Sequence, residues 1–169
     1  MDWPTFVTQW LHVLLGIFWF GASLTTNVIL VPALSRLPLA DQQRFGGAYG
    51  AVANRVLPPV AYAVVILGVI RGTVFGPLQS IDAILGTAYG LTWLIALVTA
   101  TAVQLFAQRV LAPNIHRLSE LDPATAVGVD GRPSAELSGI VARAKRHTVV
   151  ELVGFVVIFT CMILMRFGL

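Results

Sequence analysis

The stretch WLHVLLGIFWFG, residues 10–21, lies within an apolar run that extends from about Phe6 to Val31. The run contains no Lys, Arg, Asp or Glu, and it is longer than the ~20 residues that a helix needs to cross the hydrocarbon core of a bilayer. His12 is its one ionisable side chain. Ionisable residues inside spanning helices are usually functional. The stretch therefore predicts a membrane-spanning helix with His12 as a candidate functional residue.

The composition of the whole chain supports the same class of protein. Of its 169 residues, 57% are hydrophobic and 11% are charged, and the mean hydropathy is +0.83. Soluble domains carry about 25% charged residues, so the chain is expected to lie in a lipid bilayer. The net charge of +3 comes from residues that flank apolar segments, which argues against nucleic acid as a partner. The single cysteine, Cys161, excludes an internal disulfide.

Four apolar segments approach or exceed the spanning length. They run from about Phe6 to Val31, Val56 to Phe75, Ile81 to Val110 and Thr148 to Phe167. The sequence thus predicts an all-α integral membrane protein, a four-transmembrane-helix bundle that forms a single domain over residues 1–169.

Prolines and polar residues suggest details of the connections. Pro58 and Pro59 predict a kink or a late start in the second helix. The longest polar segment runs from about Pro113 to Arg146 and is interpreted as a solvated connector. Within it, Ser134 is placed to cap a helix that has Glu136 in its first turn and continues into the last span.

The basic residues are distributed unevenly between the two sides. Two of them, Arg71 and Arg166, fall on the side that carries the termini. Nine fall on the opposite side: Arg36, Arg44, Arg55, Arg109, Arg117, Arg132, Arg143, Lys145 and Arg146. Loops rich in Lys and Arg face the cytoplasm. We therefore expect a multi-pass protein of the bacterial plasma (inner) membrane, with the 113–146 loop in the cytoplasm and both termini outside.

Depth and helical phase predict which residues lie together in the bundle. Counting ~1.5 Å per residue from the outer helix ends places Tyr89, Cys161, Met162 and the Gly68–Gly72 segment near the level of His12. One stripe of the first helix holds His12, Gly16, Trp19, Ser23, Thr26 and Leu30. One stripe of the fourth holds His147, Glu151, Gly154, Ile158, Met162 and Met165. Both stripes mix small and polar residues, so we expect the two helices to face each other.

His12, Met162 and Met165 are the candidate metal ligands. Imidazole and thioether donors suit Cu(I), and histidine–methionine ligation also suits haem iron. The alternative is that the methionines only fill space, while His12 hydrogen-bonds to Tyr89 or to a backbone carbonyl.

Glu151 and His147 lie one helical turn apart near the inner end of the fourth span. One interpretation is a relay for protons or cations. The other is an ordinary ion pair of Glu151 with one of three arginines, Arg55, Arg143 or Arg146.

Arg71 and Asp82 flank the outer turn between the second and third spans. They are expected either to pair with each other or to leave Arg71 to bind a haem propionate or a lipid headgroup. Three tryptophans could pack on a cofactor: Trp10, Trp19 and Trp93. Trp19 lies deeper than Trp3 and is a better candidate for the wall of a cofactor site.

Two short motifs resemble a known family. Leu11-His12 followed by Trp19-Phe20-Gly21 resembles the opening "LH…WxG" of CopD-type copper-resistance membrane proteins, and Thr87-Ala88-Tyr89-Gly90 resembles their "TxYG" element. The related HemJ-type protoporphyrinogen oxidases share the four-span size and the early histidine. CopD-type proteins commonly carry a lysine a few residues after the "YG" element, where this chain reads Leu91-Thr92-Trp93-Leu94-Ile95. HemJ-type enzymes also rely on a lysine in the third span, and its absence here argues against protoporphyrinogen oxidation.

The leading hypothesis is a copper-handling membrane protein. Cu(I) would be accepted near His12, Met162 and Met165 and passed toward Glu151 and His147. The alternative is a membrane redox protein, or a haem-dependent membrane oxidoreductase, that holds b-type haem through four residues: His12, Trp19, Arg71 and Tyr89. A third possibility is a structural subunit without a cofactor. The expected partners are the lipid bilayer, a second copy of the chain, or a membrane protein that exchanges copper or electrons with it.

Overall fold

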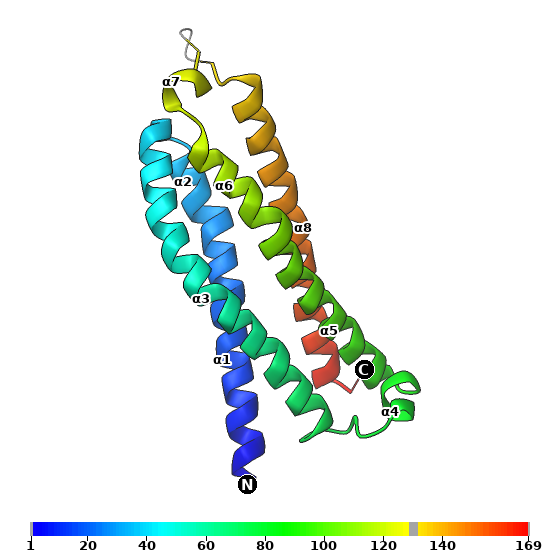
Figure 1. The fold of residues 1–169 in the computed structure, drawn as a ribbon. Helices are drawn as coiled ribbons and strands as arrows, with labels where there is room; N and C mark the ends of the chain where they lie inside the picture. Colours follow the sequence, from blue (N-terminus) through cyan, green and yellow to red (C-terminus); the bar gives the residue numbers. More distant parts are fainter. Residues whose placement is uncertain (1, 129–131, 169) are drawn as a thin grey trace.

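A computed structural model describes residues 2–128 and 132–168, and almost all of this part of the chain is helical (Figure 1). Its only β-type pairing is an isolated bridge between Val127 and Pro133. Four helical rods are long and apolar enough to cross a membrane, and they cover Trp3–Leu34, Leu39–Thr73, Ala88–Glu120 and Ala135–Arg166. The protein is therefore an all-α four-span bundle, as the sequence predicts.

Each rod consists of one or more helical segments. The first contains α1 (Trp3–Thr25), the π-helix η1 (Thr26–Leu30) and α2 (Val31–Leu34). The second is α3 (Leu39–Thr73), and the short α4 (Ile81–Leu85) follows it. The third contains α5 (Ala88–Phe106), the π-helix η2 (Ala107–Leu111) and α6 (Ala112–Glu120). The small α7 (Pro123–Ala126) then leads to the last rod, α8 (Ala135–Arg166).

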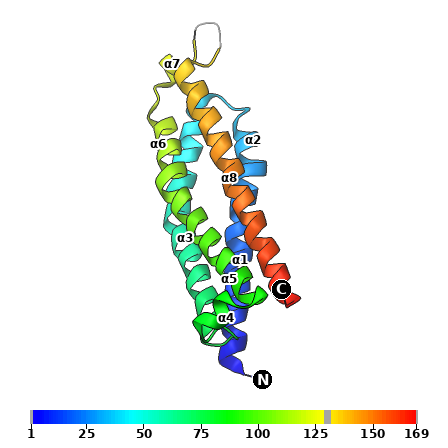
Figure 2. The same ribbon diagram turned by 90° about the vertical axis from the view of Figure 1, so that its right-hand side faces the viewer.

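The rods pack as two main pairs, α1 with α3 and α5 with α8. In contrast, α1 and α8 touch only over a short stretch, although the sequence predicts that they face each other along their length. Both views place the two chain ends and α4 at one end of the bundle, here the terminal end (Figures 1 and 2). The opposite end, which carries α2 and α7, is the loop end.

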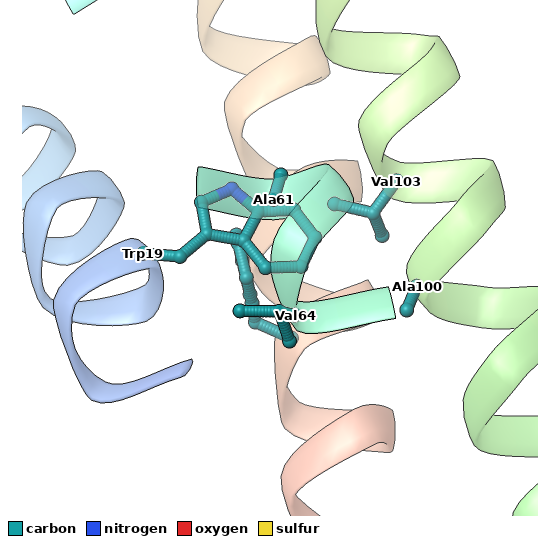
Figure 3. Packing of buried hydrophobic residues seen from close by; sticks show 6 residues of the cluster. Trp19, Ala61, Val64, Ala100 and Val103 are labelled. Atoms are coloured by element: carbon teal, nitrogen blue, oxygen red, sulfur yellow. The ribbon is translucent and has the colours of Figure 1, made fainter. Parts of the chain in front are cut away.

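The core lies where all four rods meet (Figure 3). It contains six buried residues: Trp19, Ala61, Val64, Ala100, Val103 and Phe155. Trp19 contacts Phe155 edge-on, with ring centroids 4.9 Å apart. Small residues on α3 and α5 admit the two large rings, which is how membrane helices approach closely.

The third span begins later than predicted. The prediction of one continuous helix from Ile81 is wrong, because α4 ends at Leu85 and a new helix begins at Ala88. Each helix has its own N-terminal cap: the Ser80 hydroxyl accepts a hydrogen bond from the Ala83 amide in α4, and the Thr87 hydroxyl accepts one from the Gly90 amide in α5. Each hydroxyl satisfies an amide that has no partner within its own helix.

The predicted 113–146 loop is also too long. Helix α6 continues to Glu120, and α8 begins at Ala135. The predicted start is confirmed, since the Ser134 hydroxyl accepts a hydrogen bond from the Leu137 amide and Glu136 lies in the first turn. Three buried apolar residues, Leu39, Ala126 and Leu137, hold these helix ends together at the loop end.

Helix α3 runs without interruption through Pro58 and Pro59, so a late helix start at the prolines is wrong. The helix changes direction near its middle (Figure 1), as proline kinks do. This bend brings the terminal half of α3 across from α1 toward α5.

The contact between α5 and α8 gives a test of this packing. A Cβ added to Gly154 would lie 2.3 Å from Cγ2 of Val103, whereas nothing lies within 4 Å of one added to Gly16. We expect Gly154→Ala to lower the free energy of unfolding by about 1–3 kcal/mol because the helices must separate. The matched Gly16→Ala should be neutral or stabilise by up to about 1 kcal/mol through helix propensity. Denaturant unfolding in detergent micelles measures both, and equal effects would contradict the packing.

Candidate functional site

His12 points into the bundle from α1 and is 7% exposed. Its Nδ1 lies 3.0 Å from the backbone carbonyl oxygen of Val64 on α3. A carbonyl only accepts hydrogen bonds, so Nδ1 carries the proton and donates it. In the neutral ring, Nε2 then keeps its lone pair. Of the two partners that the alternative interpretation gave His12, Tyr89 or a backbone carbonyl, the carbonyl is confirmed. This bond fixes both the tautomer and the orientation of the ring.

Two glycines of α3, Gly68 and Gly72, leave space for aromatic rings from both neighbouring helices, and we call this part of α3 the ledge. A Cβ at Gly68 would lie 3.0 Å from Cε1 of His12, and a Cβ at Gly72 would lie 2.4 Å from Nε1 of Trp93. Trp93, on α5, also donates from Nε1 to the Gly68 carbonyl oxygen at 3.3 Å. The level predicted for the Gly68–Gly72 segment is thus confirmed, and the ledge packs His12 and Trp93 against the same face of α3.

Arg71 lies beside this ledge at the terminal end. Its Nε donates to Oε1 of Gln9 at 3.0 Å, and its Nη1 donates to the carbonyl oxygen of Phe75 at 3.0 Å. The predicted pairing with Asp82 is wrong, because the guanidinium of Arg71 is bound to Gln9 and Phe75 instead. A cation is therefore held one helical turn from His12 by neutral partners.

The methionines lie on another part of the surface. Met162 is 36% exposed and Met165 is half-buried, both near the C-terminal end of α8. Figures 1 and 2 show this end apart from the N-terminal end of α1. Tyr89 is half-buried at the start of α5, and Cys161 is a buried free thiol on α8. His12 therefore contacts Val64 and Gly68 of α3. The predicted stripe on α8 does not pack against His12.

Trp19 is buried in the central core rather than beside His12. It follows His12 by about two helical turns and packs on Phe155. Toward the loop end, the next buried residue on the same face of α1 is Ser23. The predicted stripe of His12, Trp19 and Ser23 is confirmed by their burial, and Trp19 separates two polar regions.

The second polar region surrounds Glu151, which is 6% exposed. The Ser23 hydroxyl and the Asn27 amide donate hydrogen bonds to its carboxylate, with Asn27 Nδ2 3.4 Å from Oε2. Asn27 Oδ1 in turn accepts from the Thr148 hydroxyl at 3.0 Å. The alternative of an ion pair with an arginine is wrong within the described part of the chain. We call Ser23, Asn27, Thr148 and Glu151 the polar layer.

Two buried nitrogen atoms near the polar layer have no hydrogen-bond partner: Nε2 of Gln104 on α5 and Nδ1 of His147 on α8. Gln104 is 4% exposed. His147 packs edge-on against Phe106, with ring centroids 5.4 Å apart. His147 also precedes Glu151 by one helical turn of α8, so these two residues lie near each other as predicted.

No role for Asn27, Thr148 or Gln104 was foreseen from the sequence. Each of the three is a polar residue within an apolar segment, which is the signal that could have found them. The two π-helices, η1 and η2, were not foreseen either. They lie at the loop-end side of Ser23 and Gln104, and π-turns within α-helices often accompany functional sites.

The described residues contain no group of three or more His, Cys, Asp or Glu side chains suited to hold a metal ion. No protein-family model, curated protein or solved structure matches the chain. Any metal bound at His12 must therefore draw on donors other than a ready-made cluster of this kind.

The tautomer of His12 can be tested directly. We expect ¹⁵N NMR of the ring nitrogens to show the proton on Nδ1, because the Val64 carbonyl holds it there. Gly68→Ala should shift the Nδ1–H resonance, since the new methyl group displaces the ring by a few tenths of an ångström. Gly16→Ala on the same helix as His12 is the control and should leave the resonance in place. A proton found mainly on Nε2 would contradict this geometry.

Proposed function

We propose that this four-span protein handles copper at the terminal end of the bundle, with Nε2 of His12 as a ligand. One observation carries the proposal: the Nδ1 of a buried imidazole is bound to the Val64 carbonyl at 3.0 Å. Metal-binding histidines commonly donate their second ring nitrogen to a carbonyl or carboxylate, which orients the ring and strengthens its donor atom. Imidazole is also a common ligand of copper.

The remaining donors must come from outside the α1–α3 contact. The thioethers of Met162 and Met165 are soft donors that suit Cu(I), and they lie toward the same end of the bundle as the chain termini. In this proposal, the ends of α1 and α8 approach each other when Cu(I) binds. The resemblance of Leu11-His12 and Trp19-Phe20-Gly21 to CopD-type proteins supports the same substrate.

The alternative is a membrane redox protein that holds b-type haem through His12, and the position of Arg71 favours it. The guanidinium is anchored by Gln9, one helical turn from His12, where it can pair with a propionate. Haem would supply electron-transfer chemistry, while His12 would act as the axial ligand. Tyr89 would line the site, and Trp19 belongs to the core instead. A plasma-membrane location with both termini outside is part of either proposal.

Metal analysis of the purified protein distinguishes the two proposals. We expect about one equivalent of Cu(I), and we expect His12→Ala to lose it. A Met162→Leu/Met165→Leu double variant should weaken binding by about 10–100-fold if the thioethers are ligands. His116→Ala, which alters an exposed histidine of α6, is the matched control and should bind as the wild type does.

Absorption spectroscopy of the purified protein tests for haem. A Soret band in the wild-type protein that disappears in His12→Ala would contradict the copper proposal and support the haem proposal. Neither copper nor haem at meaningful occupancy would contradict both proposals and leave His12 as a structural hydrogen-bond donor.

A further inference from the structure

The polar layer around Glu151 differs in chemistry from the His12 site. Every side chain of the layer offers oxygen or amide groups: a hydroxyl from Ser23, an amide from Asn27, a hydroxyl from Thr148 and the carboxylate itself. Oxygen donors suit hard cations, whereas Cu(I) prefers sulfur and imidazole nitrogen. The layer is therefore poorly suited to receive copper from His12, in contrast to the relay that the sequence suggested.

The carboxylate of Glu151 lacks a cationic partner. Among the described residues, no ion pair involves it. Its partners, Ser23 and Asn27, are neutral donors. An unpaired carboxylate is costly to bury in an apolar interior, and such groups are neutralised by a bound cation or by a proton.

Gln104 brings an additional polar group to the same level. Trp19, Ala100 and Phe155 belong to one core cluster. One helical turn toward the loop end from these residues lie Ser23, Gln104 and Glu151, on α1, α5 and α8 respectively. The buried amide of Gln104 thus lies at the same level as the polar layer, and its Nε2 has no hydrogen-bond partner. A buried N–H donor of this kind indicates an unseen acceptor such as a water molecule.

Few other titratable groups face Glu151. On its own helix, His147 lies one turn away with an unpartnered Nδ1. From α3, Tyr49 reaches the region only through a hydrogen bond with the Thr26 hydroxyl. Arg55 on α3 and Arg109 on η2 are exposed, and the groups facing the carboxylate from α1 and α5 are neutral. Glu151 is therefore the principal acidic group of the layer.

We propose that the polar layer is a site for a hard monovalent cation, either a proton or an alkali-metal ion, which neutralises Glu151. The site is separate from the one at His12, and the Trp19–Phe155 contact lies between the two levels. Asn27, Ser23 and Gln104 supply the polar surroundings of the bound cation. Two sites of opposite chemical preference then lie along one bundle, one for a soft metal and one for a hard cation.

Carbodiimide labelling tests this proposal in the intact protein. Dicyclohexylcarbodiimide is apolar and reacts with protonated carboxyl groups, so it reports a neutral Glu151. In lipid nanodiscs and sodium-free buffer at mildly acidic pH, we expect Glu151 to be labelled about tenfold more than the exposed Glu136 of the same helix, because it lies in the apolar interior. Mass spectrometry of the peptides gives both values from one sample.

The two cations are distinguished by titration. If the site binds only protons, labelling falls as the pH rises and does not respond to Na⁺ or K⁺. If it binds an alkali-metal ion, adding that ion at fixed pH protects Glu151. Labelling no greater than that of Glu136, or labelling unchanged by pH and by both ions, would overturn the proposal.

Two matched variants complete the experiment. Gln104→Leu should shift the midpoint of the titration by about tenfold in cation concentration, since it removes a buried polar group from the layer. Gln108→Leu, one turn farther along and hydrogen-bonded to Tyr62 instead, should leave the midpoint unchanged. His12→Ala should retain the labelling of Glu151, so the failure of the copper proposal would remain distinguishable from failure of this one. Equal titration midpoints for the two glutamine variants would contradict the proposal that the polar layer binds the cation.

Discussion

The packing of Trp19 against Phe155 is the contact on which the rest of the bundle depends. It joins the α1–α3 pair to the α5–α8 pair at the level where the rods meet. Without the hydrophobic driving force that water provides, membrane helices associate through close packing and hydrogen bonds. Here an edge-on pair of rings fills the centre, while Ala61 and Ala100 let the backbones approach. The polar groups of α1 are consequently divided between two levels.

Each level satisfies its polar groups in a different way. At the terminal end, main-chain carbonyls of α3 accept hydrogen bonds from His12 and Trp93, and glycines make room for the two rings. Toward the loop end, side chains form hydrogen bonds with one another, and Asn27 links Thr148 to Glu151. The surrounding lipid supplies no water to complete such networks. The first arrangement fixes one ring rigidly, whereas the second leaves an acidic group with only neutral partners.

The sequence predicts those features that depend on one helix alone. Apolar length identifies the four spans, helical phase places His12, Trp19 and Ser23 on a buried face, and the Ser134 cap follows from local hydrogen bonding. Features that depend on how two helices pack together are harder to predict from the sequence. Equal depth places Met162 level with His12, yet depth contains no information about the angle between α1 and α8. The ledge at Gly68 and the partners of Glu151 likewise depend on how rods cross, which the spacing of residues within one rod does not encode.

The π-helix η1 has a consequence for how the first rod can vary. A π-turn accommodates one residue more than an α-helical turn would, and an added residue rotates the following chain by about 100° relative to a regular helix. The π-turn therefore sets the angle between the face that presents His12 and the face that continues into α2. Mutations that change the length of the chain near Thr26–Leu30 would rotate the segment that follows relative to the face that presents His12.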